Sequence, residues 1–181
     1  MMVGSVKSWV IVLSVVFATE IKADCAQDQQ VFSSCQIEGR NTEVFVCFDQ
    51  DRATYSYGPI SSPAEINLSE TIEGLRFEPW SGVTRSTGES VTFSNGQYSY
   101  TLIGGFERLL PEEHDLDENG DYDAKTRHYG WLEVRLNNEL LQTLNCIPET
   151  VAYAFGGGIY DLKVAAGQTW NDSSRRWVYD R

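Results

Sequence analysis

An acidic segment near the middle of the chain has the residue types and spacing of a calcium-binding loop. Residues 112–123 carry seven acidic side chains and one histidine. Calcium binds about six to eight oxygen ligands, and alternate side chains folded around a glycine turn supply them. Gly120 stands at the turn position of the EF-hand pattern. The ligand positions one, three, five, seven and nine of that pattern are occupied by Asp115, Asp117, Asn119, Asp121 and Asp123.

Two features of this segment differ from an EF-hand. Thr126 stands where the bidentate glutamate is required, and strands rather than helices are expected on both sides. The segment is therefore predicted to be a loop carried on a β-hairpin. It is either a calcium site of weak affinity, about 10⁻⁴ to 10⁻³ M, or a solvated loop tip whose Asp and Asn side chains cap their own turns. Both interpretations remain open from the sequence.

Outside this segment, the sequence contains little that indicates chemistry. It has no G-x-S-x-G, H-E-x-x-H or C-x-x-C motif, and its two histidines are His114, near the start of the acidic segment, and His128, shortly after its end. We therefore expect a protein that is not an enzyme. A glycosidase that uses two carboxylates among Glu89, Glu107 and Glu133 is the remaining catalytic alternative.

The first 23 residues have the pattern of a signal peptide. Lys7 precedes an apolar core at residues 9–18, and Ala23 is the best cleavage position. The apolar core is shorter than the roughly 20 residues that a membrane-spanning helix needs. We expect a single mature domain at residues 24–181, located in the periplasm or secreted, with no membrane insertion after cleavage.

The mature chain is strongly acidic. Removing Lys7, Lys22 and Glu20 with the signal peptide leaves 12 basic and 25 acidic residues, a net charge of −13. Such a field repels nucleic acid and anionic membrane surfaces, and attracts a cationic partner from a distance. Solubility alone is the other explanation of the charge.

All four cysteines follow the signal peptide. An even number of cysteines in an exported chain favours two disulfides, for which three pairings are possible. Their spacing resembles no thiolate metal site. The cysteines are Cys25, Cys35, Cys47 and Cys146.

Two segments have the alternating pattern of β-hairpins. In residues 90–102 the turn is predicted at Asn95-Gly96, which pairs Phe93 with Tyr98 and Val91 with Tyr100. In residues 130–146 it is predicted at Asn137-Asn138. That turn places Leu132, Val134 and Leu141 on one face, and Glu133 and Gln142 on the other.

Shorter strands are predicted elsewhere, together with one helix. Strands are expected on both sides of a turn at residues 38–41, and at 53–58, 65–69 and 74–80. A short helix is expected at 159–166, ending at Gly167. The fold class is therefore mainly β, an antiparallel barrel or sandwich of about seven to nine strands with one short C-terminal helix.

The C-terminal tail combines aromatic and basic residues. Trp170, Trp177 and Tyr179 lie close in sequence to Arg175 and Arg176. We expect buried rings that cap the domain. An exposed aromatic-basic binding tail is the alternative.

Residues 35–146 resemble a group of small uncharacterised proteins exported by Gram-negative bacteria. The resemblance implies a periplasmic domain and no particular activity. It is carried by VFVC (44–47), YSYGP (55–59), EPWSGVTRSTGESVTFSNGQYSYT (78–101), LQTLNC (141–146) and DLKVAAGQTW (161–170).

A looser resemblance is to the periplasmic inhibitors of c-type lysozyme. These are eight-stranded antiparallel barrels that insert a Ser-Gly-x-x-Tyr loop into the lysozyme cleft. Ser81 and Gly82 begin a comparable loop next to Trp80, but Arg85 stands where the inhibitors have tyrosine. The resemblance implies a binding site at these four residues.

These observations favour a non-catalytic periplasmic binding domain. Its partner is expected to be a cationic protein such as a cell-wall hydrolase, which it would inhibit or against which it would confer immunity. A calcium-stabilised structural domain that maintains the envelope is the alternative function.

Overall fold

The computed structural model describes residues 25–82, 85–109, 125–155 and 158–179. The predicted signal peptide lies outside these residues. In the part of the chain that is described, no helix is long and apolar enough to cross a membrane.

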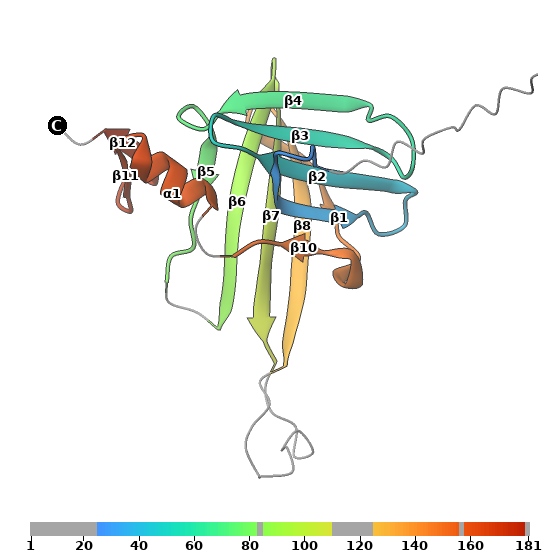
Figure 1. The fold of residues 1–181 in the computed structure, drawn as a ribbon. Coiled ribbons are helices and arrows are strands. Elements are labelled where there is room, and N and C mark those ends of the chain that lie inside the picture. Colours follow the sequence, from blue (N-terminus) through green and yellow to red (C-terminus); the bar gives the residue numbers. More distant parts are fainter. Residues whose placement is uncertain (1–24, 83–84, 110–124, 156–157, 180–181) are drawn as a thin grey trace, which may run out of the picture.

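The described chain forms two five-stranded antiparallel sheets (Figure 1). The first sheet has the order β10-β1-β2-β3-β4 and the second has the order β5-β6-β7-β8-β9. The strands of the first sheet are β1 (Gln30–Gln36), β2 (Thr42–Phe48), β3 (Arg52–Pro59), β4 (Ile66–Thr71) and β10 (Ala152–Tyr153). Those of the second sheet are β5 (Arg76–Glu78), β6 (Ser86–Asn95), β7 (Tyr98–Arg108), β8 (Thr126–Leu136) and β9 (Glu139–Asn145).

The rest of the described chain is short and lies near the C-terminus. A 3₁₀ turn, η1 (Pro148–Thr150), precedes β10, and helix α1 (Gly158–Ala165) is followed by a hairpin of β11 (Gln168–Asn171) and β12 (Arg176–Tyr179). The predicted fold class is confirmed, including the short helix that ends before Gly167. The β11–β12 hairpin was not predicted, because its Trp and Arg residues show no alternation of apolar and polar positions.

The two sheets pack face to face, with their strands running across one another (Figure 1). Alternation along each strand supplies the core, because every second side chain points inward. Val44 and Val46 of β2 are fully buried, as are Val91 of β6 and Leu102 of β7. The ring of Tyr55 from β3 stacks on that of Tyr100 from β7, with centroids 5.5 Å apart. The core therefore lies between the sheets.

Gly104 of β7 lets the sheets approach closely. A Cβ atom at this position would lie 2.6 Å from the Ser33 hydroxyl oxygen and 3.0 Å from the ring of Tyr153. Ser33 pairs with Tyr153 where β1 meets β10. Because Gly104 has no side chain, β1 and β10 at the edge of the first sheet can pack against β7 in the middle of the second.

The β6–β7 hairpin is present, but its predicted register is wrong by two residues. Phe93 pairs with Tyr100, not Tyr98, and Val91 pairs with Leu102. The turn is Gly96-Gln97, and of these two residues Gly96 alone has a positive φ, as a type II′ turn requires. A slip of two residues keeps every side chain on its predicted face. It brings the fully buried Leu102 opposite Val91, which the predicted register does not.

The predicted turn of the β8–β9 hairpin is confirmed. Asn137 and Asn138 both have positive φ values, 51° and 69°. A bulge between Val134 and Arg135 then places Val134 opposite Gln142. Leu141 does not join Leu132 on the core face, since it is 53% exposed. The predicted faces were wrong beyond the bulge because the extra residue inverts the alternation of β9.

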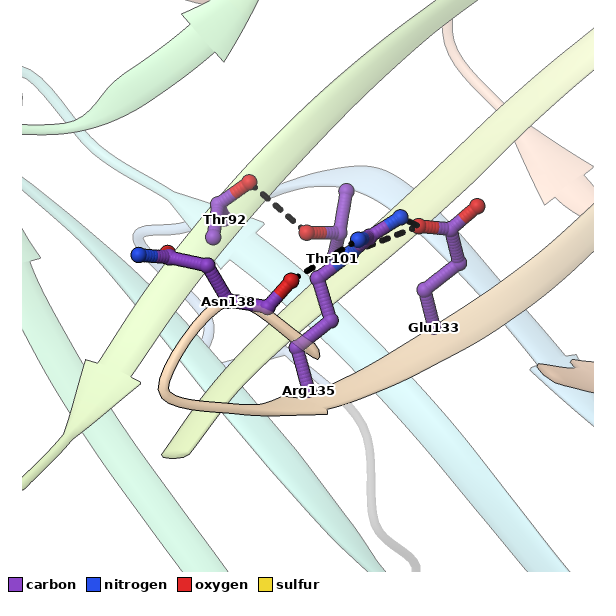
Figure 2. Close-up of polar contacts among 5 residues, drawn as sticks. All are labelled: Thr92, Thr101, Glu133, Arg135 and Asn138. Atoms are coloured by element: carbon purple, nitrogen blue, oxygen red, sulfur yellow. Dashed lines mark hydrogen bonds and ion pairs between the residues drawn. The ribbon is translucent and has the colours of Figure 1, made fainter. Parts of the chain in front are cut away.

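The outer face of the second sheet is polar near the β8–β9 turn. Figure 2 shows the Thr92 and Thr101 hydroxyls 2.9 Å apart across β6 and β7. On β8, the guanidinium of Arg135 donates to the Glu133 carboxylate at 2.8 Å and to the Asn138 carbonyl at 3.2 Å. One face of this sheet therefore packs in the core, and the other carries side chains suited to water.

Two disulfides are present, and the structure selects one of the three possible pairings. Cys25 is bonded to Cys47, and Cys35 to Cys146, with Cα atoms 5.5 and 5.6 Å apart. The second bond joins β1 to the residue that follows β9, and so links the two sheets. Two disulfides fit an oxidising compartment outside the cytoplasm.

Removing the disulfide between the sheets is expected to destabilise the protein more than removing the other. In the chain-entropy model, a disulfide that closes a loop of about 100 residues stabilises the folded protein by about 4.7 kcal/mol. A disulfide that closes a loop of about 15 residues stabilises it by about 3 kcal/mol. The two bonds span 111 and 22 residues. Urea unfolding of Cys35→Ala/Cys146→Ala and Cys25→Ala/Cys47→Ala measures the difference. An equal or larger loss in the second variant would contradict this account.

Candidate functional site

Three of the four residues suggested by the inhibitor-like loop line one pocket. Trp80, Gly82 and Arg85 lie at the wall of a pocket of about 700 Å³. Ser81 is exposed beside Gly82 and does not line it. We call this the Trp80 pocket. The described residues that line it are Trp80, Gly82, Arg85, Thr87, Phe106, Arg108 and Phe155.

The pocket forms where the long strands of the second sheet pass the edge of the first. In Figure 1 the lower ends of β6, β7 and β8 extend beyond β10, the edge strand of the first sheet. Thr87 of β6 and Phe106 of β7 are paired in register and belong to the inward face. At this end that face meets the segments around Trp80 and Phe155 instead of the first sheet.

Aromatic rings from three segments meet in the pocket. Phe155 makes edge-to-face contacts with Trp80 and Phe106, with centroids 5.9 and 5.5 Å apart. Phe155 is nevertheless 46% exposed. The Nε1 atom of Trp80 is buried and has no hydrogen-bond partner among the described residues. A buried donor without a partner costs about 1–3 kcal/mol, so the packing here is not optimised for stability alone.

A buried carboxyl group fixes the position of Trp80. Glu89 of β6 accepts a hydrogen bond from the Tyr153 hydroxyl at 2.9 Å and another from the backbone N–H of Trp80. Burial raises the pKa of Glu89 above its ordinary value, although both hydrogen bonds oppose the shift. Glu89 thus connects β6 to β10 and to the loop that precedes β6, and acts as a positioning residue.

The pocket is locally cationic. Arg85 and Arg108 line it, and among the described residues no carboxylate side chain does. Their backbones are joined by a 3.3 Å hydrogen bond from the Arg108 N–H to the Arg85 carbonyl. In the described residues neither guanidinium has an ion-pair partner. Two guanidinium groups without an ion-pair partner, beside the exposed ring of Phe155, are suited to an acidic group on a partner.

Sequence reasoning missed several of these residues. Phe106, Arg108, Tyr153 and Phe155 belong to no motif, and tertiary packing alone brings them to Trp80. Glu89 had a usable signal: it stands two residues before Val91, at an inward position of an alternating strand. An acidic residue at an inward position indicates a partner in the interior.

The three glutamates of the glycosidase alternative do not share a face. Glu89 lies on the inward face of the second sheet, with Val91. Glu107 and Glu133 lie on the outer face, where they pair with Arg127 and Arg135. The exposed His128 has its Nδ1 atom 3.1 Å from the Val151 carbonyl oxygen.

The predicted calcium ligands lie outside the described residues. These are Asp115, Asp117, Asn119, Asp121 and Asp123. The strands on either side are described, and Arg108 of β7 pairs with Thr126 of β8. Within the described residues, no group of three or more His, Cys, Asp or Glu side chains is placed to hold a metal ion. Calcium binding and a solvated loop tip both remain predictions.

Comparison with protein-family models, with curated proteins and with solved structures finds no match to this chain.

Replacing Glu89 by glutamine is expected to change how stability depends on pH. Because the pKa of Glu89 is raised in the folded protein, the folded state keeps a proton that the unfolded state has lost. The free energy of unfolding therefore falls as pH rises from about 4.5 through the raised pKa. Glu89→Gln keeps a hydrogen-bond acceptor oxygen but cannot ionise, so it removes this fall. Urea unfolding across that range, with the exposed Glu38→Gln as control, tests the effect, and parallel curves for wild type and Glu89→Gln would refute it.

Melting with calcium and with a chelator separates the two interpretations of the acidic segment. If calcium binds, a calcium concentration of about 100 times the Kd adds about 2.7 kcal/mol to the free energy of unfolding. A solvated loop tip adds nothing. If calcium binds, Asp115→Asn with Asp117→Asn abolishes the difference between the two melting temperatures. Equal melting temperatures for the unaltered protein would eliminate the calcium interpretation.

Proposed function

We propose that this protein is a non-catalytic periplasmic binding domain that inhibits, or gives immunity against, a cationic cell-wall hydrolase. The observation that carries the proposal is the cationic, aromatic Trp80 pocket on a mature chain of net charge −13. The described fold, the two disulfides and the resemblance of the loop at Trp80 to those of lysozyme inhibitors support it.

The two signs of charge have separate roles in this proposal. The overall negative field accelerates encounter with a cationic protein. Glycosidases of the cell wall carry paired carboxylates in their clefts. Arg85 and Arg108 supply the opposite charge at the point of contact, so the partner is positive as a whole and negative where it is bound.

The exposed part of the loop has a form suited to entering a cleft. Ser81 and Gly82 are both exposed, and Gly82 has a φ of 86° with no atom within 4 Å of a Cβ built at that position. Trp80 directly precedes these residues, and its ring contacts that of Phe155. Tryptophan and arginine are among the residues that contribute most to binding at protein interfaces. Trp80 is therefore the anchor, and Arg85 the group that meets the carboxylates.

The binding test compares Arg85→Ala with Arg40→Ala. Both changes remove one positive charge, and the exposed Arg40 side chain does not line the Trp80 pocket. Long-range attraction alone predicts that both variants bind a cationic c-type lysozyme as well as wild type or slightly better. Direct contact predicts that Arg85→Ala alone loses about 30-fold in affinity, the size of a loss of about 2 kcal/mol.

Calorimetry at low and high salt measures the affinities, and clearing of a peptidoglycan suspension measures inhibition. Arg108→Ala should lose affinity to a similar extent as Arg85→Ala, because both side chains line the pocket. Association should slow as salt is added, because the attraction is screened. Equal behaviour of Arg85→Ala and Arg40→Ala, or no binding by the unaltered protein at low salt, would reject the proposal.

A further inference from the structure

The C-terminal unit, residues 158–179, packs beside the edge strand of the second sheet (Figure 1). The Trp177 indole N–H donates to the Phe77 carbonyl of β5 at 2.8 Å, and the two rings stack with centroids 6.1 Å apart. Lys163 of α1 and Gln168 of β11 both donate to the Glu73 carbonyl. These bonds hold the unit in one position against β5.

A groove of about 560 Å³ lies between this unit and the second sheet. Its volume falls within the range of about 300–1,000 Å³ typical of small-molecule sites. We call it the hairpin groove. It is lined by Glu73, Gly74, Leu75, Arg76, Phe77, Glu78, Ser90, Thr92, Lys163, Gln168, Trp170, Arg175, Arg176 and Trp177. Four of these residues are basic and two are acidic, although the mature chain has about twice as many acidic residues as basic ones.

Two of the four basic side chains that line the groove already form hydrogen bonds or an ion pair within the protein. Arg175 forms an ion pair with Glu78. Lys163 is almost fully buried, and its ammonium donates to the Glu73 carbonyl and to Gln168 Oε1 at 3.1 and 3.2 Å. The Glu73 carboxylate accepts the Tyr179 hydroxyl at 2.9 Å. Lys163 and Arg175 are therefore structural.

The other two basic residues are available. Arg76 of β5 and Arg176 of β12 are exposed, and in the described residues their side chains have neither a hydrogen bond nor an ion pair. They approach the groove from its two sides, one from the sheet and one from the hairpin. Guanidinium groups bind carboxylates and phosphates through paired hydrogen bonds. The groove is therefore suited to an anion.

The remaining lining favours a hydroxylated ring over an apolar one. Trp170 and Trp177 are half-buried, with centroids 5.7 Å apart. The Trp170 indole N–H already donates to Asp172, so its ring face is the part left for a ligand. Hydroxyl groups come from Ser90 and Thr92, and Thr92 is further fixed by Thr101 (Figure 2). Such polar groups suit a ligand that also forms hydrogen bonds.

The overall charge limits the size of the ligand. A mature chain of net charge −13 repels a polyanion along its length, whereas a single acidic group meets the local excess of arginine. We propose that the hairpin groove binds a small acidic saccharide, with its carboxylate held by Arg76 and Arg176 and its ring against Trp170. This site is separate from the Trp80 pocket and does not depend on its function.

The test is a titration of the mature protein followed by ¹H–¹⁵N NMR. Trp80, Trp131, Trp170 and Trp177 each give one indole N–H signal, and Trp131 lines neither the hairpin groove nor the Trp80 pocket. Glucuronate and glucose form a matched pair that differs at the carboxylate. Glucuronate should shift the Trp170 and Trp177 signals in a saturable way, with Trp131 unchanged and glucose at least about tenfold weaker.

Variants test the two arginines. Arg76→Ala and Arg176→Ala should each weaken glucuronate binding by about tenfold, whereas Arg40→Ala, with the same change of charge, should leave it unaltered. Unshifted signals elsewhere in the spectra verify that each variant is folded. Equal binding of glucose and glucuronate, equal effects of all three variants, or no saturable shift would overturn the proposal. Inorganic phosphate binding as tightly as glucuronate would also overturn it, since that result shows a simple anion site.

Discussion

The arrangement of the molecule depends on the place where the chain leaves the second sheet for the first. Cys146, directly after β9, donates its N–H to the Gly130 carbonyl of β8, and Ile147 donates to the Gln36 carbonyl of β1. The disulfide from Cys35 to Cys146 fixes this crossing covalently. Because β10 then pairs with β1, Tyr153 is placed over the second sheet, where it meets Glu89. The Trp80 pocket is a consequence of this crossing.

Glycine and a buried carboxyl group make the same junction possible. Gly104 leaves room for Ser33 and Tyr153 against β7. The Tyr153 hydroxyl reaches Glu89, which in turn holds the backbone of Trp80. Burying a carboxyl group costs free energy, and these hydrogen bonds only offset that cost. Its presence is more consistent with holding a loop in one conformation than with strengthening the core.

The C-terminal unit covers β5, the edge strand of the second sheet. An edge strand exposes unpaired N–H and carbonyl groups to other chains. The Trp177 indole N–H donates a hydrogen bond to the Phe77 carbonyl of β5. The side chains of Lys163 and Gln168 donate to the carbonyl of Glu73, which lies shortly before β5. Covering an edge with a helix and a hairpin, rather than with a further strand of the sheet, leaves a groove beside it. The hairpin groove is formed by this covering unit.

Basic residues are few in this chain, and their distribution is uneven. Arg127 and Arg135 neutralise glutamates on the outer face of the second sheet. The arginines without ion-pair partners in the described residues include the pair in the Trp80 pocket and the pair in the hairpin groove. An acidic protein that leaves arginines unpaired in pockets has local fields opposite in sign to its overall field.

Features that depend on neighbouring residues could be predicted from the sequence. Alternation predicted the mainly β class, Asn137-Asn138 predicted its turn, and Gly167 predicted the end of the helix. Tertiary structure decided the rest, because it depends on contacts between distant residues. The β6–β7 register follows from pairing Leu102 with Val91 in the core, and the disulfide pairing follows from the crossing at Cys146. The Trp80 pocket likewise required β10 to reach β6, which no local pattern encodes.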